Sequence, residues 1–189
     1  FTATETSKNL AILFEGLANL QPWTSDNPAL YTVEIIQKDA AGKEESVTAT
    51  KYGFCVATIQ NNQFLVNGKR VLMKGVNTQD THPIMGRTMD IETMWTDLML
   101  MKQNNVNMVR SSHYPRSPKM NAMMDYIGMY QMDEADVEFH KNWSNGGRIH
   151  TSSSWRAPIV DRITRMVLRD RNHPCVVSWS LGNESDGGV

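Results

Sequence analysis

The chain has 189 residues, of which 40% are hydrophobic and 21% charged, and its formal net charge is −1. This composition is typical of one globular domain or parts of two, and it excludes collagen-like and disordered chains. The charge balance gives no support to nucleic-acid binding, and the apolar runs are too short to cross a bilayer.

The first 60 residues predict β-structure. Residues 31–35 alternate between apolar and polar side chains, which indicates a half-buried strand, and 46–50 and 52–59 predict further strands. Residues 23–28 form a polar loop and residues 39–43 a turn. We therefore interpret residues 1–60 as the C-terminal part of an immunoglobulin-like β-sandwich domain.

Asn67-Gly68 lies between the apolar runs 64–66 and 71–73. Asn-Gly between such runs predicts a hairpin, because a type I′ turn requires positive φ at both central residues. The hairpin marks the point after which strands and helices alternate.

Residues 61–189 predict four βα units. Strands are expected at 73–77, 106–110, 129–132 and 175–181, with one helix capped by Asp90, one starting at Pro118 and ending before Gly128, and one near Pro158. Apolar residues repeat at steps of three and four along these helices: Ile91, Met94, Leu98 and Met101; Met120, Met123, Met124 and Ile127; Ile159, Ile163, Met166 and Val167. Four such units make a parallel sheet and half of a (β/α)8 TIM barrel, so the predicted class is α/β with an all-β segment.

The sulfur-containing residues predict core positions. The 13 methionines fall mainly on the expected helix faces, where Met fills irregular gaps. Cys55 and Cys175 lie in apolar, strand-like contexts, which favours two buried free thiols over a disulfide or a metal pair.

Polar side chains follow each of the four predicted barrel strands. The carboxyl ends of barrel strands converge on one mouth, so these groups predict an active site there. They are Asn77, Asp80 and His82; Arg110, Ser112 and His113; Asp133, Glu134, Asp136, Glu138 and His140; and Asn183 and Glu184.

Each candidate also has a structural interpretation. Glu138 and His140 are two residues apart, so on an extended segment both could face one metal ion, but a His at a strand end is more often only hydrogen-bonded. Asp133-Glu134 could cap a helix or pair with a buried Arg. Arg110 could balance that charge, and His113 could be a turn residue. Glu184 follows an apolar strand and is the strongest candidate for a general acid, since desolvation at a barrel mouth raises a carboxyl pKa.

Three segments carry a family resemblance. The stretch 170–185, which contains Asn183-Glu184, resembles the acid/base signature of family 2 glycoside hydrolases. The stretches 109–115 and 132–140 resemble two further signatures of the family, and 67–77 is similar to its barrel entry. The order and spacing match over residues 20–189 and are most similar to β-galactosidases, with Tyr126, Asp136 and 140–143 resembling a Bacteroides-type branch.

The resemblance implies roles for individual residues. Glu184 would be the acid/base, and Asn183 would bind the sugar 2-hydroxyl. His113 would stabilise the transition state, and Arg110 would position the catalytic carboxylates. Glu138, His140 and Glu184 would hold Mg²⁺, and Ser185, where glucuronidases usually have proline, favours a galactosidase.

One stretch departs from the family pattern. Many family galactosidases have Asn-Arg-His-Glu-His-His-Pro after the first barrel strand, whereas residues 77–83 here read Asn-Thr-Gln-Asp-Thr-His-Pro. We place Asp80 and His82 at the rim of the sugar pocket. The departure leaves the substrate open, with β-glucuronidase and β-mannosidase as alternatives to β-galactosidase. A non-catalytic sugar-binding fragment is a further alternative, because fold alone does not exclude it.

The family mechanism is retaining, with two carboxyl groups about 5 Å apart. The nucleophile is expected on a later barrel strand, outside this chain, so the chain is expected to be an internal fragment that is inactive alone. Such an open half-barrel would expose two sheet edges and apolar helix faces. The resemblance further implies a carbohydrate substrate, a homo-oligomeric full-length enzyme and a periplasmic or secreted location, with no nucleic-acid or membrane partner.

Overall fold

The computed structural model describes residues 12–139, 149 and 152–185. Its strands are β1 (Tyr31–Lys38), β2 (Glu44–Tyr52), β3 (Ala57–Gln60), β4 (Gln63–Val66), β5 (Lys69–Arg70), β6 (Gly75–Thr78), β7 (Met108–Ser111), β8 (Tyr130–Glu134) and β9 (Val176–Ser180). Its helices are α1 (Ile91–Gln103), α2 (Pro118–Ile127) and α3 (Arg156–Asp170), the last preceded by a 3-10 turn, η3 (Ser153–Trp155).

The centre of the molecule is a parallel four-stranded sheet in the order β6-β7-β8-β9. Successive strands along the chain are neighbours in the sheet, and α1, α2 and α3 connect them. This arrangement agrees with the predicted N-terminal half of a TIM barrel. Within the described residues β6 and β9 form the two edges of the sheet.

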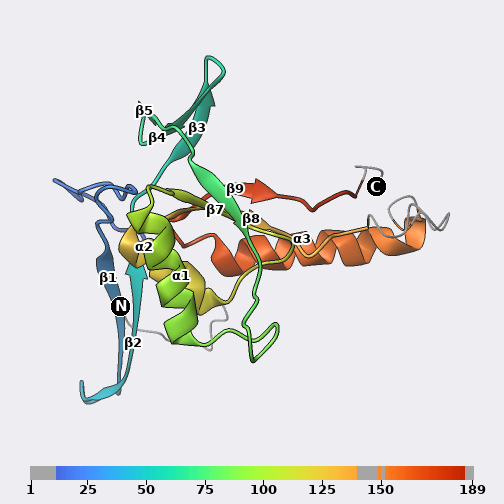
Figure 1. The fold of residues 1–189 in the computed structure, drawn as a ribbon. Coiled ribbons are helices and arrows are strands. Elements are labelled where there is room, and N and C mark those ends of the chain that lie inside the picture. Colours follow the sequence, from blue (N-terminus) through green and yellow to red (C-terminus); the bar gives the residue numbers. More distant parts are fainter. Residues whose placement is uncertain (1–11, 140–148, 150–151, 186–189) are drawn as a thin grey trace.

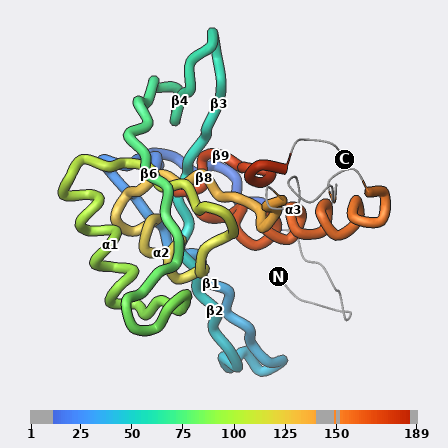
Figure 2. The backbone as a smooth tube through the Cα atoms, turned by 45° about the vertical axis from the view of Figure 1, so that its right-hand side comes forward, coloured from blue at the N-terminus to red at the C-terminus, as the bar shows by residue number. Residues whose placement is uncertain are grey.

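Two small antiparallel sheets precede the parallel one. β1 pairs with β2, and β3, β4 and β5 pair in that order. The two sheets project from the central sheet in opposite directions in both views (Figure 1, Figure 2). The boundary predicted at residue 60 falls inside the β3–β4 hairpin, and the immunoglobulin-like sandwich stays a prediction.

The Asn-Gly hairpin forms as predicted, but its second strand is shorter. Asn67 has φ 50° and Gly68 has φ 76°, as a type I′ turn requires. β5 ends at Arg70, and the first barrel strand begins at Gly75 rather than Met73. The reason is Asn107, whose side chain accepts from the Lys74 N–H (2.7 Å) and donates to the Leu72 carbonyl (3.0 Å), in place of a neighbouring strand.

The strand predicted over residues 52–59 is likewise interrupted. The Phe54 carbonyl accepts from the Trp23 N–H at 2.9 Å, and the Val56 N–H donates to the side chain of Asn67 at 2.9 Å. These contacts take backbone groups that a continuous strand would have used. Strand pairing therefore stops at Tyr52 and resumes at Ala57.

The helix ends follow the predicted signals. The Asp90 carboxylate accepts from the Thr93 N–H at 2.7 Å, which caps α1. Pro118 occupies the first position of α2, and Gly128 ends that helix with φ 73°. A Cβ atom at residue 128 would lie 2.3 Å from the Ser25 carbonyl oxygen, so glycine is required there for space as well as for conformation.

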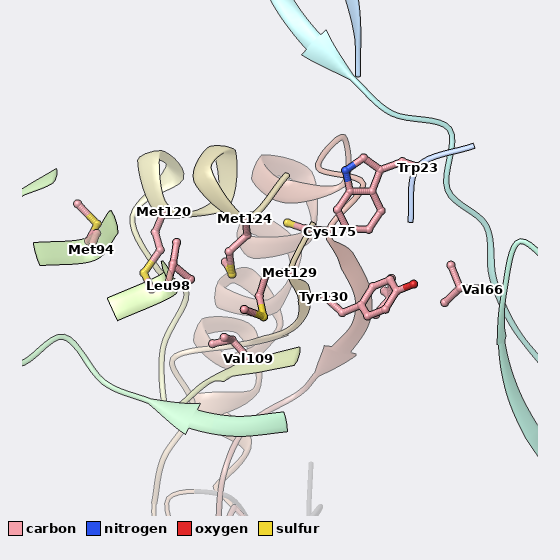
Figure 3. Close-up of a cluster of buried hydrophobic side chains, with 11 residues drawn as sticks. Trp23, Val66, Met94, Leu98, Val109, Met120, Met124, Met129, Tyr130 and Cys175 are labelled. Atoms are coloured by element: carbon pink, nitrogen blue, oxygen red, sulfur yellow. The ribbon is translucent and has the colours of Figure 1, made fainter. Parts of the chain in front are cut away.

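The main core lies between α1, α2 and the parallel sheet (Figure 3). Its fully buried members include Leu98, Met124 and Met129, which confirms that the methionines serve as core filler. Cys175 is buried in this core as a free thiol, and Cys55 is a half-buried free thiol against it. Ile91 differs from the prediction, since at the first position of α1 it is 53% exposed.

A second core cluster joins α3 to the segment after β8. Ala135, Val137 and Phe139 are buried against Met166 of α3. Alternation places Glu138 on the other side of this segment, toward the turn that follows β9. The apolar side thus fixes which way the predicted metal ligand points.

Trp23 anchors the N-terminal segment to the barrel half. Its side chain is fully buried, its Nε1–H donates to the Asp125 carbonyl at 2.7 Å, and its ring packs edge-on against Tyr130 at 5.7 Å. Lys102 adds hydrogen bonds from Nζ to the carbonyls of Ser25 (2.7 Å) and Gly128 (2.6 Å). This contact lies at the amino ends of the barrel strands. Within the described residues, no helix has the length and apolarity needed to span a membrane.

Candidate active site

The carboxyl ends of β7, β8 and β9 meet at one charged cluster. Arg110 of β7 donates from Nε to Glu134 Oε2 of β8 at 2.6 Å. Ser180, the last residue of β9, donates its hydroxyl to the same oxygen at 2.7 Å. Glu134 is fully buried, and the Arg110 side chain is 26% exposed. One carboxylate thus connects three strands at the edge where barrel active sites lie.

His113 joins this cluster from the loop after β7. Its Nδ1 lies 2.7 Å from Glu134 Oε1 and 3.5 Å from the guanidinium nitrogen Nη2 of Arg110. Glu134 therefore holds the imidazole and the guanidinium on its two separate oxygens. This fixes the positions of two predicted sugar-binding groups relative to each other.

Asn183 extends the cluster to the turn after β9. Its Oδ1 accepts from the guanidinium of Arg110 at 2.9 Å, and its Nδ2 donates to Glu138 Oε2. Its backbone N–H donates to the Val137 carbonyl at 2.8 Å, as part of a parallel bridge between Glu138 and Asn183. Arg110 holds the amide oxygen of Asn183 and Glu138 holds its amide nitrogen, so the side chain of Asn183 has a fixed orientation.

Glu184 follows Asn183 in a left-handed conformation with φ 45°. This region is uncommon for residues other than glycine, and such positions gather at functional sites. Gly182 makes the preceding turn with φ 152°, where a Cβ would lie 2.5 Å from the Val137 carbonyl oxygen. Glu184 itself is exposed, in contrast to the desolvated setting expected from sequence, because the four described barrel strands do not enclose the mouth.

Asp80 and His82 lie apart from this cluster. Asp80 pairs with the buried guanidinium of Arg116 at 2.7 Å, and its backbone N–H donates to the Tyr114 hydroxyl at 2.8 Å. The Nδ1 of His82 accepts from the backbone N–H groups of residues 84 and 85, inside its own turn. These contacts give both residues a structural role, and the rim of a sugar pocket stays a prediction for them.

The structure describes two of the three predicted metal ligands. Glu138 and Glu184 lie on neighbouring turns, joined through Asn183, whereas His140 lies outside the described residues. In the described part of the chain no three His, Cys, Asp or Glu side chains are grouped to hold a metal ion. Carboxylate oxygens suit Mg²⁺, so the donor chemistry fits while the full ligand set rests on the resemblance.

Ser180 is a site residue that the sequence did not indicate, and Glu134 was one of the strand-end candidates without an assigned catalytic or binding role. One interpretation of Asp133-Glu134 was pairing with a buried Arg; Glu134 does pair with an Arg, but Arg110 is only half-buried. The available signal was alternation, since Tyr130, Met132 and Glu134 share one face of β8. Arg110 is in register with Met132, so its long side chain reaches Glu134 one step further along.

His173, which lies within the acid/base signature, is remote from the site. Its Nδ1 lies 2.5 Å from a carboxylate oxygen of Asp125, whose other oxygen accepts from the Cys175 N–H at 3.0 Å. Burial alone would lower the pKa of His173, but the hydrogen bond and the charge of Asp125 outweigh it and raise this pKa. This half of the signature orders the start of β9, and the other half carries Asn183 and Glu184.

Comparisons with known proteins agree with this arrangement. The family model for the TIM barrel domain of glycosyl hydrolases family 2 matches residues 57–189. A beta-galactosidase of Pectobacterium atrosepticum is 43% identical over 167 residues, which is 88% of this chain and 16% of that protein. The chain therefore spans a small part of the length of this relative.

Solved structures of glucuronidases share the fold. A β-glucuronidase from Ruminococcus gnavus in complex with uronic isofagomine superimposes with a TM-score of 0.81 and 26% identity, over 90% of this chain and 30% of that one. The β-glucuronidase of Parabacteroides merdae gives a TM-score of 0.74 and 25% identity, over 90% of this chain and 20% of that one. The family model covers the parallel sheet and the cluster at its strand ends. The chain therefore belongs to glycoside hydrolase family 2, and its residues 57–189 match the TIM barrel domain of that family.

Proposed function

We propose that this chain supplies the acid/base half of a retaining β-galactosidase site. The observation that carries the proposal is the network at the strand ends, in which Arg110 joins Glu134 and Asn183 beside Glu184. The second carboxylate of the mechanism, the nucleophile, comes from residues outside this chain, as does the rest of the barrel. The N-terminal strands then belong to the preceding sandwich domain.

In this mechanism Glu184 protonates the leaving oxygen and afterwards activates the water that attacks the glycosyl-enzyme. Its exposure gives it access to a leaving group at the mouth of the sheet. Asn183, held by Arg110 and Glu138, presents its amide to the sugar 2-hydroxyl, a contact that strengthens in the transition state. His113, fixed by Glu134, presents its other ring nitrogen to the sugar.

A leaving-group comparison tests the role of Glu184. The complete enzyme containing this chain is assayed on aryl β-galactosides with good and poor leaving groups, as wild type and as Glu184→Ala. The variant should lose about 10²–10⁴-fold in rate on the poor leaving group, which needs protonation, and far less on the good one. Exposed Asp161→Ala is the control. Equal losses on both substrates would contradict an acid role.

The substrate class has a second candidate. The two solved structures named above are β-glucuronidases, whereas the curated relative with 43% identity is a beta-galactosidase. The higher identity and Ser185 after Glu184 favour the galactoside. Relative kcat/KM values of the complete enzyme on aryl β-galactoside, β-glucuronide and β-mannoside decide between them. Sugar binding without hydrolysis of any of the three would instead indicate a non-catalytic binding module.

We further propose Mg²⁺ at Glu138, His140 and Glu184. Two observations support this proposal. Glu138 forms a β-bridge with Asn183, which directly precedes Glu184, and Mg²⁺ prefers carboxylate oxygens as ligands. When bound, the ion would supply positive charge beside the acid/base. Calorimetric titration with MgCl₂ should give one site in the wild type and weaker binding in Glu138→Gln, with Asp136→Asn as the control. Equal affinity in Glu138→Gln and wild type would exclude Glu138 as a ligand.

A further inference from the structure

Two buried carboxyl groups lie behind β8, on the face opposite the site. Asp133 of β8 and Asp170 at the end of α3 are both fully buried. Asp170 accepts from Arg169 at 2.8 and 2.6 Å on its two oxygens. Within the described part of the chain no cation forms an ion pair with Asp133, whose Oδ1 accepts from Ser111 Oγ (3.1 Å) and Gln131 Nε2 (3.2 Å).

The remaining oxygen of Asp133 requires a proton. Among the described residues Oδ2 meets no hydrogen-bonding partner. After burial, the neighbouring carboxyl of Asp170 is the next cause that raises the pKa of Asp133. Two buried carboxylates beside a single guanidinium leave one negative charge without compensation, which is costly in an apolar interior. A proton on Oδ2 removes that charge and supplies the missing donor to Asp170.

The charges around the pair identify Asp133 as the protonated member. Burial, and then the neighbouring Asp170, raise the pKa of Asp133 to about 7, against an opposing effect of Ser111 and Arg169. The bidentate contact with Arg169 compensates the charge of Asp170, whereas Asp133 makes no such contact. Among the described residues two other titratable groups act on the pair. Burial raises the pKa of the Cys175 thiol well above its ordinary value, so this thiol stays neutral. His173 interacts with Asp170 and Arg169, and its pKa, which burial alone would lower, is raised by its contact with Asp125.

Ser111 connects this pair to the site. Its hydroxyl donates to Asp133 Oδ1 and accepts from the Glu134 N–H at 2.8 Å. Glu134 in turn holds Arg110 at 2.6 Å and His113 at 2.7 Å. A displacement of Asp133 is therefore transmitted through one hydroxyl to the backbone of the residue that orders the site.

We propose that Asp133 is a positioning residue: it shares one proton with Asp170 behind β8 and, through Ser111, holds Glu134 in place. The catalytic meaning of this role rests on the proposed function, but the shared proton does not. Because the folded-state pKa of Asp133 is raised, its protonation stabilises the protein fully below about pH 4. That contribution is lost as the pH rises through about 7.

The decisive variant is Asp133→Asn, which keeps the shape and both hydrogen-bonding directions of the protonated acid. Infrared difference spectra at about pH 6, where ordinary carboxyls are ionised, should show a protonated carboxyl band in wild type. That band should be absent in Asp133→Asn and retained in the exposed control Asp136→Asn. Unfolding stability should decline between about pH 4 and 7 in wild type and decline less in Asp133→Asn. No protonated band in the wild type, or a band unchanged in Asp133→Asn, would overturn the proposal.

Kinetics of the complete enzyme test the positioning role separately. Asp133→Asn should match the wild-type kcat/KM below about pH 7. Above that pH, where ionisation of Asp133 is expected to lower the wild-type kcat/KM, the variant should decline less. Ser111→Ala keeps the protonated band but should lower kcat about tenfold, the scale of one lost hydrogen bond. If Ser111→Ala has wild-type kcat, the link to Glu134 is refuted. If every variant including wild type lacks glycosidase activity while the infrared results hold, the proposed function fails and the shared proton stands.

Discussion

Replacing Glu134 by alanine should destabilise the protein strongly, because it removes the one carboxylate that connects three barrel strands. Each hydrogen bond from a charged donor contributes about 1.5–3 kcal/mol, and breaking a buried ion pair costs about 3–5 kcal/mol. The side chains of Arg110 and His113 are 26% and 28% exposed, so water replaces part of what they lose. The expected loss in the free energy of unfolding is therefore about 3 kcal/mol, near the lower end of that range.

Glu134→Gln separates charge from shape. The amide oxygen still accepts from Arg110 and Ser180, and its NH₂ group can donate to His113 Nδ1, so the packing is retained. The expected loss is about 1–2 kcal/mol, since only the charge is removed. Urea unfolding followed by circular dichroism measures both variants, with Asp161→Ala as the control. That exposed carboxylate pairs with Arg165 at 2.7 Å on the surface of α3, where an ion pair contributes about 0.5 kcal/mol or less.

Two outcomes would refute this reasoning. If Glu134→Ala lost no more stability than Asp161→Ala, solvent would satisfy Arg110 completely and Glu134 would not organise the strand ends. If Glu134→Gln lost as much as Glu134→Ala, the charge rather than the geometry would hold the cluster together. A typical domain has about 5–15 kcal/mol of stability, so the expected losses are measurable without abolishing the fold.

Two further predictions concern the N-terminal segment. Trp23→Phe keeps an aromatic side chain but leaves the Asp125 carbonyl without its hydrogen-bond donor. Thermal unfolding should show that the free energy of unfolding falls by about 1–3 kcal/mol. A melting temperature equal to that of the wild type would show that water reaches this carbonyl. Gly128→Ala places a Cβ 2.3 Å from the Ser25 carbonyl oxygen. The control is Gly42→Ala, where the φ of 84° is equally unfavourable for alanine but no atom lies within 4 Å of the new Cβ. Gly128→Ala should therefore lose clearly more stability than Gly42→Ala, and equal losses would mean that the clash is relieved at no cost.

The barrel half could be predicted from sequence because its signals are local. Asp90, Pro118 and Gly128 mark helix ends through their own backbone or capping chemistry, and the Asn67-Gly68 turn is specified by two residues. Strand limits were less accurate where a distant side chain took over backbone hydrogen bonds. Asn107, for example, satisfies the backbone of residues 72 and 74, and no local pattern announces a contact 33 to 35 residues away.

In the candidate site, too, some residues could be predicted from the sequence, whereas others depend on contacts between distant segments. The resemblance and the position at strand ends selected Arg110, His113 and Asn183, and the structure brings these three together. Asp80 is tied to a buried Arg116 instead, a pairing that depends on how the loops after β6 and β7 pack. Glu134, the carboxylate that connects three strands, was open to several interpretations in the sequence. An acidic residue at the end of a strand can cap a helix, pair with an Arg or act in catalysis. Only the register of β7 against β8 decides among them.

The placement of Trp23 separates substitutions that affect the attachment of the N-terminal segment from substitutions that affect the site. Its indole is bound at the amino ends of the barrel strands, whereas Arg110, Glu134 and Asn183 lie at the opposite ends. Residues that attach the N-terminal β-structure can thus be replaced, and the attachment strengthened or loosened, without displacing a site group. An engineer who exchanges the N-terminal segment for that of a relative should keep Trp23, which is bound by Asp125 and Tyr130, and Gly128, against which Ser25 lies, and can leave the site residues unchanged.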